Sequence, residues 1–315
     1  MTDLTTDAPT RFVGCDVGKK TITVFDSATG NRVDLPNTMQ ALDDLAASLD
    51  PACLVICEAT GGYEALLLDA CSRAGLAVHR ADARKVKAFI RSLGTLAKTD
   101  AIDAKALARY GQERHDRLPR WQPREQDREA LHALVAARSD LVRTRVAWSN
   151  RLAAPGSHHA AEELRTLLDS HDQAIASIEA KIDTLLRSSA MLARTARTLL
   201  AIPGIGATTA AALIAFMPEL GTVTRKQAAS LAGLAPHPRQ SGASIGYRRT
   251  RGGRPEIKRI LFMAALSAVQ HNQALKTFRQ RLISNGKKPI VALVACMRKL
   301  IVIANAKLRD QLASI

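Results

Sequence analysis

Four acidic residues of this 315-residue chain, Asp16, Glu58, Asp100 and Asp103, have the types and settings of metal ligands. Asp16 and Glu58 lie in or beside apolar runs, where an unpaired carboxylate is costly. Carboxylates that share a site repel one another unless a cation intervenes. Together, four can hold two hard divalent ions about 3.5–4 Å apart, a pair suited to phosphodiester cleavage. The residues therefore predict a divalent-cation site, although each alone also fits an ordinary turn or a solvated helix face.

The elements that must position these acids follow an α/β pattern. Residues 11–26 alternate as a β-hairpin, and a third short strand is expected near residues 31–35. Further along, apolar runs predict buried strands at 53–60 and 76–82, and amphipathic or basic patterns predict helices at 38–49, 63–74, 83–92 and 99–111. This order predicts an α/β domain over residues 1–122 with a mixed sheet, and it suits a ribonuclease H-like fold.

Residues 123–188 have a different periodicity. Apolar and arginine positions from Leu131 to Leu152 recur in steps of three and four, and Leu164 to Leu185 repeat the pattern after Pro155 and Gly156. These seams predict two long helices of a coiled-coil segment. The seams fit an antiparallel hairpin packed on its own chain and a dimerisation arm equally well.

The region 189–315 is expected to be mainly helical, with a loop at residues 233–255, which hold five of the 18 glycines. The chain carries a net charge of +16, and residues 201–315 contribute 18 basic and only 3 acidic side chains. This asymmetry predicts a polyanionic partner for the last third of the chain. Seven basic residues between positions 239 and 259 are candidate nucleic-acid contacts: Arg239, Arg248, Arg249, Arg251, Arg254, Lys258 and Arg259.

A glycine-bearing turn, Pro203-Gly204-Ile205-Gly206, separates two helical runs and resembles a helix-hairpin-helix. Gly204 and Gly206 would let backbone N–H groups approach a DNA phosphate at the start of the next helix. An ordinary helix–helix turn is the alternative. Ser241 lies within the basic loop, where arginines could stabilise charge that develops at an attacked phosphate, although no local base accompanies it.

Several other classes do not fit the sequence. The first eleven residues lack the apolar core of a signal peptide, and Arg298 and Lys299 interrupt the most apolar C-terminal stretch, which argues against a membrane span. The five cysteines form no C-x-x-C pair and are interpreted as reduced core residues of a cytoplasmic protein. No P-loop is present to hydrolyse a nucleotide.

Five motifs in register resemble the transposases of the insertion sequence 110 family, RNA-guided DNA recombinases of bacterial mobile elements. They cover almost the whole chain and read GCDVGKK, ICEATGGYE, KTDAIDAKALARY, IPGIGATTAA and GLAPHPRQSG. The resemblance implies a RuvC-like N-terminal domain whose Asp16, Glu58, Asp100 and Asp103 hold Mg²⁺, with Mn²⁺ as a substitute. It also implies a coiled-coil linker and a C-terminal transposase domain in which Ser241 attacks DNA and forms a covalent phosphoserine link.

The same resemblance implies donor and target DNA, a non-coding bridge RNA and a homo-oligomer, either dimer or tetramer, as partners. It places the protein in the bacterial cytoplasm with the nucleoid. Two other functions stay open at this point. A hydrolytic endonuclease of the Holliday-junction resolvase type would use the four acids without the serine. A non-catalytic nucleic-acid-binding protein would use the acids for structure alone.

Overall fold

A computed structural model describes residues 8–94, 100–123, 125–241 and 244–314, excluding the side chains of 100–101, 238–241 and 244–248. The chain forms two compact units, Met1–Pro123 and Arg124–Ile315. The expected end of the α/β domain at residue 122 lies one residue from this boundary. The long helical segment after it belongs to the second unit.

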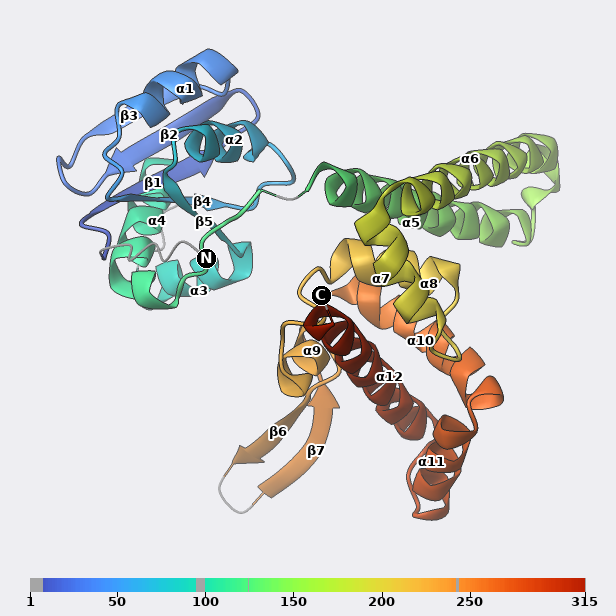
Figure 1. Cartoon of the computed structure of the whole chain (residues 1–315). Coiled ribbons are helices and arrows are strands. Elements are labelled where there is room, and N and C mark those ends of the chain that lie inside the picture. The colour runs from blue at the N-terminus through green and yellow to red at the C-terminus, as the bar shows by residue number, and fades with distance from the viewer. Residues whose placement is uncertain (1–7, 95–99, 124, 242–243, 315) are drawn as a thin grey trace. The chain divides into compact units, whose positions relative to one another are not determined.

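The first unit is built on a five-stranded mixed sheet with the order β3-β2-β1-β4-β5 (Figure 1). β1 pairs antiparallel with β2 and parallel with β4, while β5 continues the parallel half. The strands are β1 (Arg11–Val17), β2 (Thr21–Asp26), β3 (Arg32–Pro36), β4 (Cys53–Glu58) and β5 (Ala77–Ala81). The predicted strand order along the chain and the mixed sheet are confirmed.

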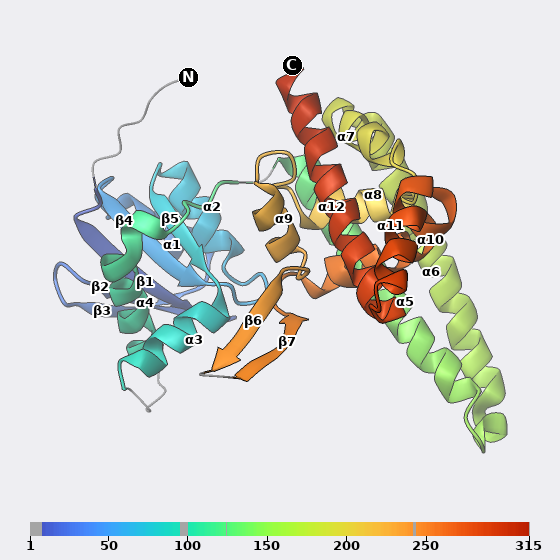
Figure 2. The same cartoon turned by 90° about the horizontal axis from the view of Figure 1, so that it is seen from below.

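Helices cover both faces of this sheet, as Figures 1 and 2 show. They are α1 (Met39–Ala47), α2 (Ala65–Arg73), α3 (Ala83–Ser92) and α4 (Asp100–Arg114), which η1 (His115–Arg117) follows. One apolar cluster joins the sheet to α1 and α2, and includes Val13, Cys15, Val55 and Cys57. A second joins the other face to α3 and α4. Because side chains alternate along a strand, consecutive residues of β1 and β4 contribute to opposite layers.

Gly14 determines how closely α4 packs on the sheet. A Cβ atom at Gly14 would lie 2.0 Å from the carbonyl oxygen of Ala104 and 2.5 Å from the backbone nitrogen of Ala108. Only a residue without a side chain permits that approach. Farther along α4, a Cβ at Gly111 would meet Ile56 and Phe12. The helix therefore runs antiparallel to β1, with its first turn toward the C-terminal ends of β1 and β4.

The second unit is mainly helical, as predicted, apart from one strand pair. Its first two helices form an antiparallel hairpin through a break at Ala153–Gly156, tied by ion pairs of Arg138 with Glu179 and of Arg145 with Asp172. The hairpin interpretation of the heptad seams is thus confirmed within the chain. The helical elements of the second unit are α5 (Gln126–Leu152), η2 (Ser157–Ala160), α6 (Ala161–Ser188), α7 (Ala190–Leu200), α8 (Ala207–Phe216), α9 (Arg225–Leu231), α10 (Pro255–His271), α11 (Gln273–Ser284) and α12 (Pro289–Ala313).

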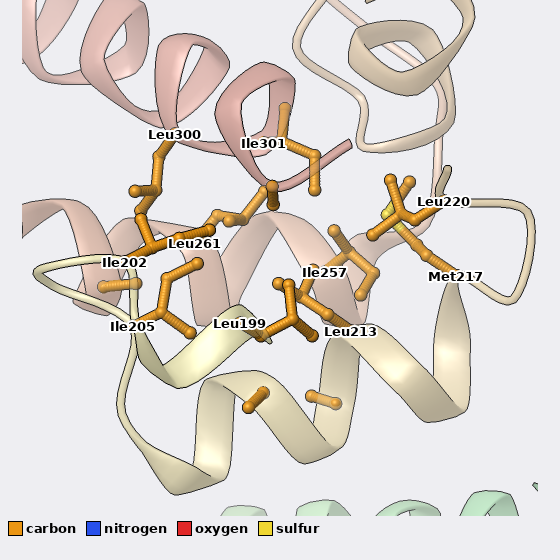
Figure 3. Close-up of a cluster of buried hydrophobic side chains, with 14 of the residues drawn as sticks. Leu199, Ile202, Ile205, Leu213, Met217, Leu220, Ile257, Leu261, Leu300 and Ile301 are labelled. Carbon is orange, nitrogen blue, oxygen red and sulfur yellow. The ribbon is translucent and has the colours of Figure 1, made fainter. Parts of the chain in front are cut away.

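The core of the second unit gathers apolar side chains from α7, α8, α10 and α12 (Figure 3). Leu213 of α8, Leu261 of α10 and Leu300 of α12 are fully buried there. By length and composition α12 could cross a membrane. Its buried residues, among them Cys296, Ile301 and Ala304, belong instead to this core. The apolar character of α12 therefore matches a core helix, in agreement with the sequence analysis.

The expected loop at residues 233–255 is wrong over most of its length. The chain forms an antiparallel hairpin of β6 (Pro236–Ser241) and β7 (Ser244–Thr250). The strand register shifts between His237 and Arg239, on either side of Pro238. Proline has no N–H to donate, so it is tolerated in a strand at such an irregularity. The sequence predicted a loop here because glycine and proline are rare in strands. The pairing of these two strands depends on contacts across the hairpin, which composition does not show.

Candidate active site and nucleic-acid surface

Asp16 and Glu58 lie at the same end of two neighbouring strands. Cys15 of β1 is in register with Cys57 of β4, and each carboxylate is the next residue along its strand. Parallel neighbours are about 4.8 Å apart, and matching positions face the same side of the sheet. Both cysteines face α1 and α2, so Asp16 and Glu58 belong to the face that α4 covers. Both are half-buried. The sheet thus brings together two acids that are 42 positions apart.

The first turn of α4 approaches the same end of the sheet. Ala104 packs over Gly14, two residues before Asp16, and Asp103 immediately precedes Ala104. Asp103 is half-buried. Asp100 is the first residue of α4, one turn before Ala104, and its side chain lies outside the described residues. The topology therefore places all four predicted acids at one end of one sheet face.

Within the described side chains, no three His, Cys, Asp or Glu groups already stand close enough together to hold a metal ion. That set includes Asp16, Glu58 and Asp103 but not Asp100. The donor chemistry nevertheless fits a hard cation, because carboxylate oxygens are the ligands that Mg²⁺ and Mn²⁺ take. Carboxylates that share a site repel one another when no cation lies between them.

The sequence analysis overlooked Glu64, which is 1% exposed beside this site. Its Oε1 accepts hydrogen bonds from the Arg80 guanidinium, including one of 2.7 Å from Nε, and its Oε2 accepts from the backbone N–H groups of Thr60 and Gly62. Burial alone would raise the pKa of Glu64, but these hydrogen bonds and the charge of Arg80 lower it below its usual value. The available sequence signal was the pair Gly61-Gly62, two residues before Glu64, because adjacent glycines indicate a tight turn. In the structure both glycines adopt positive φ.

Ser241 is the last residue of β6 and pairs with Ser244 across the hairpin. The side chains of Ser241, Arg239 and Arg248 lie outside the described residues. The backbone of Ser241 is nevertheless described. Ser241 ends a strand of a two-stranded ribbon, whereas the sequence analysis expected it to lie in a loop.

The other predicted basic contacts divide into two groups. Arg249 and Arg251 are exposed, and Arg259 is 56% exposed with a 3.5 Å contact to Glu256. Arg254, in contrast, donates to both carboxylate oxygens of Glu219, at 2.8 and 2.5 Å, and to the carbonyl oxygen of Phe216. Lys258 contacts Thr250 at 3.3 Å. The guanidinium of Arg254 therefore holds α10 against the segment after α8, and its contact with nucleic acid stays a prediction.

The two glycines between α7 and α8 also differ. A Cβ at Gly204 would lie 2.3 Å from the Cβ of Ala268 on α10, and its φ is +99°. Gly204 is therefore required for helix packing, and its expected contact with a DNA phosphate stays a prediction. A Cβ at Gly206, the N-cap of α8, would meet nothing within 4 Å. Gly206 therefore borders open space that a ligand can enter.

Comparisons with known proteins agree with this architecture. A family model described as Transposase, the DEDD transposase of IS110, matches residues 13–155. A second, described as Transposase IS116/IS110/IS902 family, matches residues 196–280. The pilin gene-inverting proteins of Moraxella lacunata and Moraxella bovis are each 30% identical over 317 residues, which cover 95% of this chain and 96% of the relative. An uncharacterized protein of insertion element IS110 from Streptomyces coelicolor is 36% identical over 143 residues, 44% of this chain and 34% of that protein.

The two units and these matches define a DNA transposase or recombinase enzyme. The chain belongs to the IS110 family of transposases. The resemblance seen in the five sequence motifs is thereby confirmed.

Proposed function

We propose that this transposase breaks and rejoins DNA with a four-carboxylate metal site in a ribonuclease H-like, RuvC-like domain and with Ser241 as the nucleophile. The strand register carries the proposal, because Cys15 opposite Cys57 puts Asp16 and Glu58 side by side. The strand order β3-β2-β1-β4-β5, with α4 across β1 and β4, supports the ribonuclease H-like assignment.

Asp16, Glu58, Asp100 and Asp103 would hold Mg²⁺, or Mn²⁺ in its place. When bound, such ions stabilise negative charge on the oxygens of a phosphodiester under attack. The protein's own contribution is to hold these carboxylates on rigid strands and on the first turn of a helix. A close-packed interface at Gly14 fixes that turn against the sheet.

In the proposed cleavage step, the Ser241 oxygen forms a bond to phosphorus and the bond from phosphorus to one deoxyribose oxygen breaks. The serine hydroxyl loses its proton and the departing deoxyribose oxygen gains one. Because the product is a phosphodiester of serine, a deoxyribose hydroxyl can reverse the step without ATP. The exposed Arg249, in register with His237 at the opposite end of the same hairpin from Ser241, gives this ribbon a positive charge that can contact the DNA backbone.

The partners proposed for this chain extend those that the family establishes. The pilin gene-inverting relatives are named for DNA inversion, and we infer a comparable rearrangement of donor and target DNA here. A bridge RNA would supply the target sequence, and the α5–α6 hairpin would join subunits into a dimer or tetramer in the bacterial cytoplasm. Sequencing RNA that copurifies with the protein tests the guide; mass photometry of the full chain tests the oligomer.

The serine is tested with labelled DNA, guide RNA if one copurifies, and Mg²⁺, followed by denaturing electrophoresis. Wild type should give a covalent protein–DNA adduct, and Ser241→Ala should abolish it while DNA binding persists. Ser244→Ala is the matched control, because Ser244 is the cross-strand partner of Ser241 in the same hairpin. Recombination by Ser241→Ala would show that the nucleophile is assigned wrongly.

A hydrolytic endonuclease of the junction-resolving type remains the second candidate, favoured by the carboxylates alone. It predicts free 5′-phosphate ends from junction DNA and no adduct, with Ser241→Ala fully active. The third function considered from sequence, a non-catalytic binding protein, disagrees with the membership of this chain in a transposase family.

A further inference from the structure

Two loops follow the carboxylates at the end of the sheet. The turn after β1, Gly18–Lys20, begins two residues beyond Asp16. The segment 59–64 follows Glu58 and leads into α2. Each loop continues directly from the strand end that carries one of the two carboxylates, Asp16 or Glu58. The contacts between these loops therefore bear on the proposed metal site.

Asn37, the residue after β3, joins the two loops. Its side-chain Nδ2 donates to the carbonyl oxygen of Gly18 and to that of Tyr63, each at 3.0 Å. Its backbone N–H donates to the carbonyl oxygen of Lys20 at 2.8 Å. Both side-chain partners are carbonyl oxygens, so the amide nitrogen, and not the amide oxygen, must face them. One side chain thus connects the turn after Asp16 to the loop after Glu58.

The loop that Asn37 holds is itself rigid. Tyr63 precedes Glu64, whose buried carboxylate accepts from the Thr60 and Gly62 N–H groups at 3.2 and 2.9 Å. The same carboxylate is anchored to Arg80 of β5. A contact at Tyr63 is therefore transmitted to the whole segment after Glu58, and through Arg80 to the sheet.

The second polar atom of Asn37 shows that this residue does not maximise stability. Its Oδ1 is shielded from solvent and has no hydrogen-bond partner among the described residues. A buried acceptor without a partner destabilises the fold, which offsets much of what two neutral hydrogen bonds contribute. Replacing Asn37 with alanine should therefore change folding stability little, and an effect on the carboxylate site can be measured separately.

We propose that Asn37 is a positioning residue of the transposase reaction, which sets the spacing of Asp16 and Glu58 by tying together the loops that follow them. This inference rests on the proposed metal site. Groups that orient metal ligands without touching the metal typically affect metal affinity 10–100-fold. The predicted phenotype is weaker divalent-metal binding in a folded protein.

The experiment measures Mn²⁺ binding to the full chain by electron paramagnetic resonance, together with the Mg²⁺ dependence of DNA cleavage. Asn37→Ala should raise the Mn²⁺ dissociation constant about tenfold. The Mg²⁺ concentration for half-maximal cleavage should rise similarly, while the rate at saturating Mg²⁺ approaches wild type. Asn37→Asp keeps the shape but cannot donate, so it should also weaken binding although its added charge alone would strengthen it. Asn31→Ala, at an exposed asparagine in the β2–β3 turn, is the matched control.

Thermal unfolding in EDTA should be nearly unchanged in Asn37→Ala, whereas Asn37→Asp should unfold at a somewhat lower temperature because its carboxylate faces two carbonyl oxygens. Unchanged Mn²⁺ affinity in these variants, with affinity lost in Asp16→Asn, would overturn the role of Asn37 and leave the metal site intact. Unchanged affinity in Asp16→Asn as well would overturn the metal site itself. Weakened binding in Asn31→Ala of the same size would also contradict the inference, because that residue joins neither loop.

Discussion

Arg254 and Glu219 form a two-pronged ion pair in the second unit, with Arg254 Nη2 2.5 Å from Glu219 Oε1 and Nη1 2.8 Å from Oε2. A third hydrogen bond reaches the carbonyl oxygen of Phe216, so the guanidinium fixes the start of α10 to the segment after α8. Bidentate hydrogen bonds between a guanidinium and a carboxylate are stronger than neutral hydrogen bonds and fix the relative orientation of the two groups.

We predict that Arg254→Ala lowers the free energy of unfolding by about 1–3 kcal/mol, because several hydrogen bonds to a charged group are lost. Chemical denaturation measures this. The matched control is Arg251→Ala, at an exposed neighbour, which should leave stability within about 0.5 kcal/mol of wild type. Equal stability of the two variants would contradict the structural role of Arg254.

A second prediction concerns DNA affinity. Arg249 and Arg251 are exposed in the most basic part of the chain, and each phosphate contact adds about one unit to the slope of log affinity against log salt. Arg251→Ala should therefore weaken binding and reduce this slope by about one, as measured by fluorescence anisotropy at several salt concentrations. A slope that is already flat for wild type would remove the basic surface from the function.

Substitutions of the two glycines in the α7–α8 turn are predicted to have different effects on stability. Gly204→Ala forces a contact with Ala268 and a positive φ on a residue with a side chain, so it should destabilise the second unit by at least about 1–3 kcal/mol. Gly206→Ala meets open space and should fold normally. Reduced DNA affinity of Gly206→Ala at unchanged melting temperature would support backbone contact with phosphate there; unchanged affinity would identify the turn as structural alone.

The buried thiols predict an alkaline loss of stability in the first unit. Burial raises the pKa of Cys57 from 9.0 to about 12. Between these values the unfolded thiol ionises and the folded one does not, so stability present below pH 9 declines as pH rises. The slope is about 1.4 kcal/mol per pH unit for one such thiol. Urea unfolding of wild type and Cys57→Ala at pH 8 and pH 10 measures it: the stability difference between them should shrink as pH rises, and a constant difference would contradict the shift.

Sequence pattern alone determined the order of elements in the first unit, the two long helices and the concentration of positive charge near the C-terminus. These features follow from local periodicity and composition, which need no knowledge of distant contacts. The candidate acids were found in the same way, since Asp16 and Glu58 end apolar runs that must be strands.

Tertiary structure decided what depends on pairing across the chain. The register of Cys15 with Cys57 makes neighbours of two distant acids, and close packing at Gly14 places the first turn of α4 beside them. It likewise showed that Arg254 is committed to Glu219, and that a segment rich in glycine and proline pairs as a hairpin. The type of a residue determines which contacts it is able to make. Which of those contacts forms depends on the partner that the folded chain places beside it.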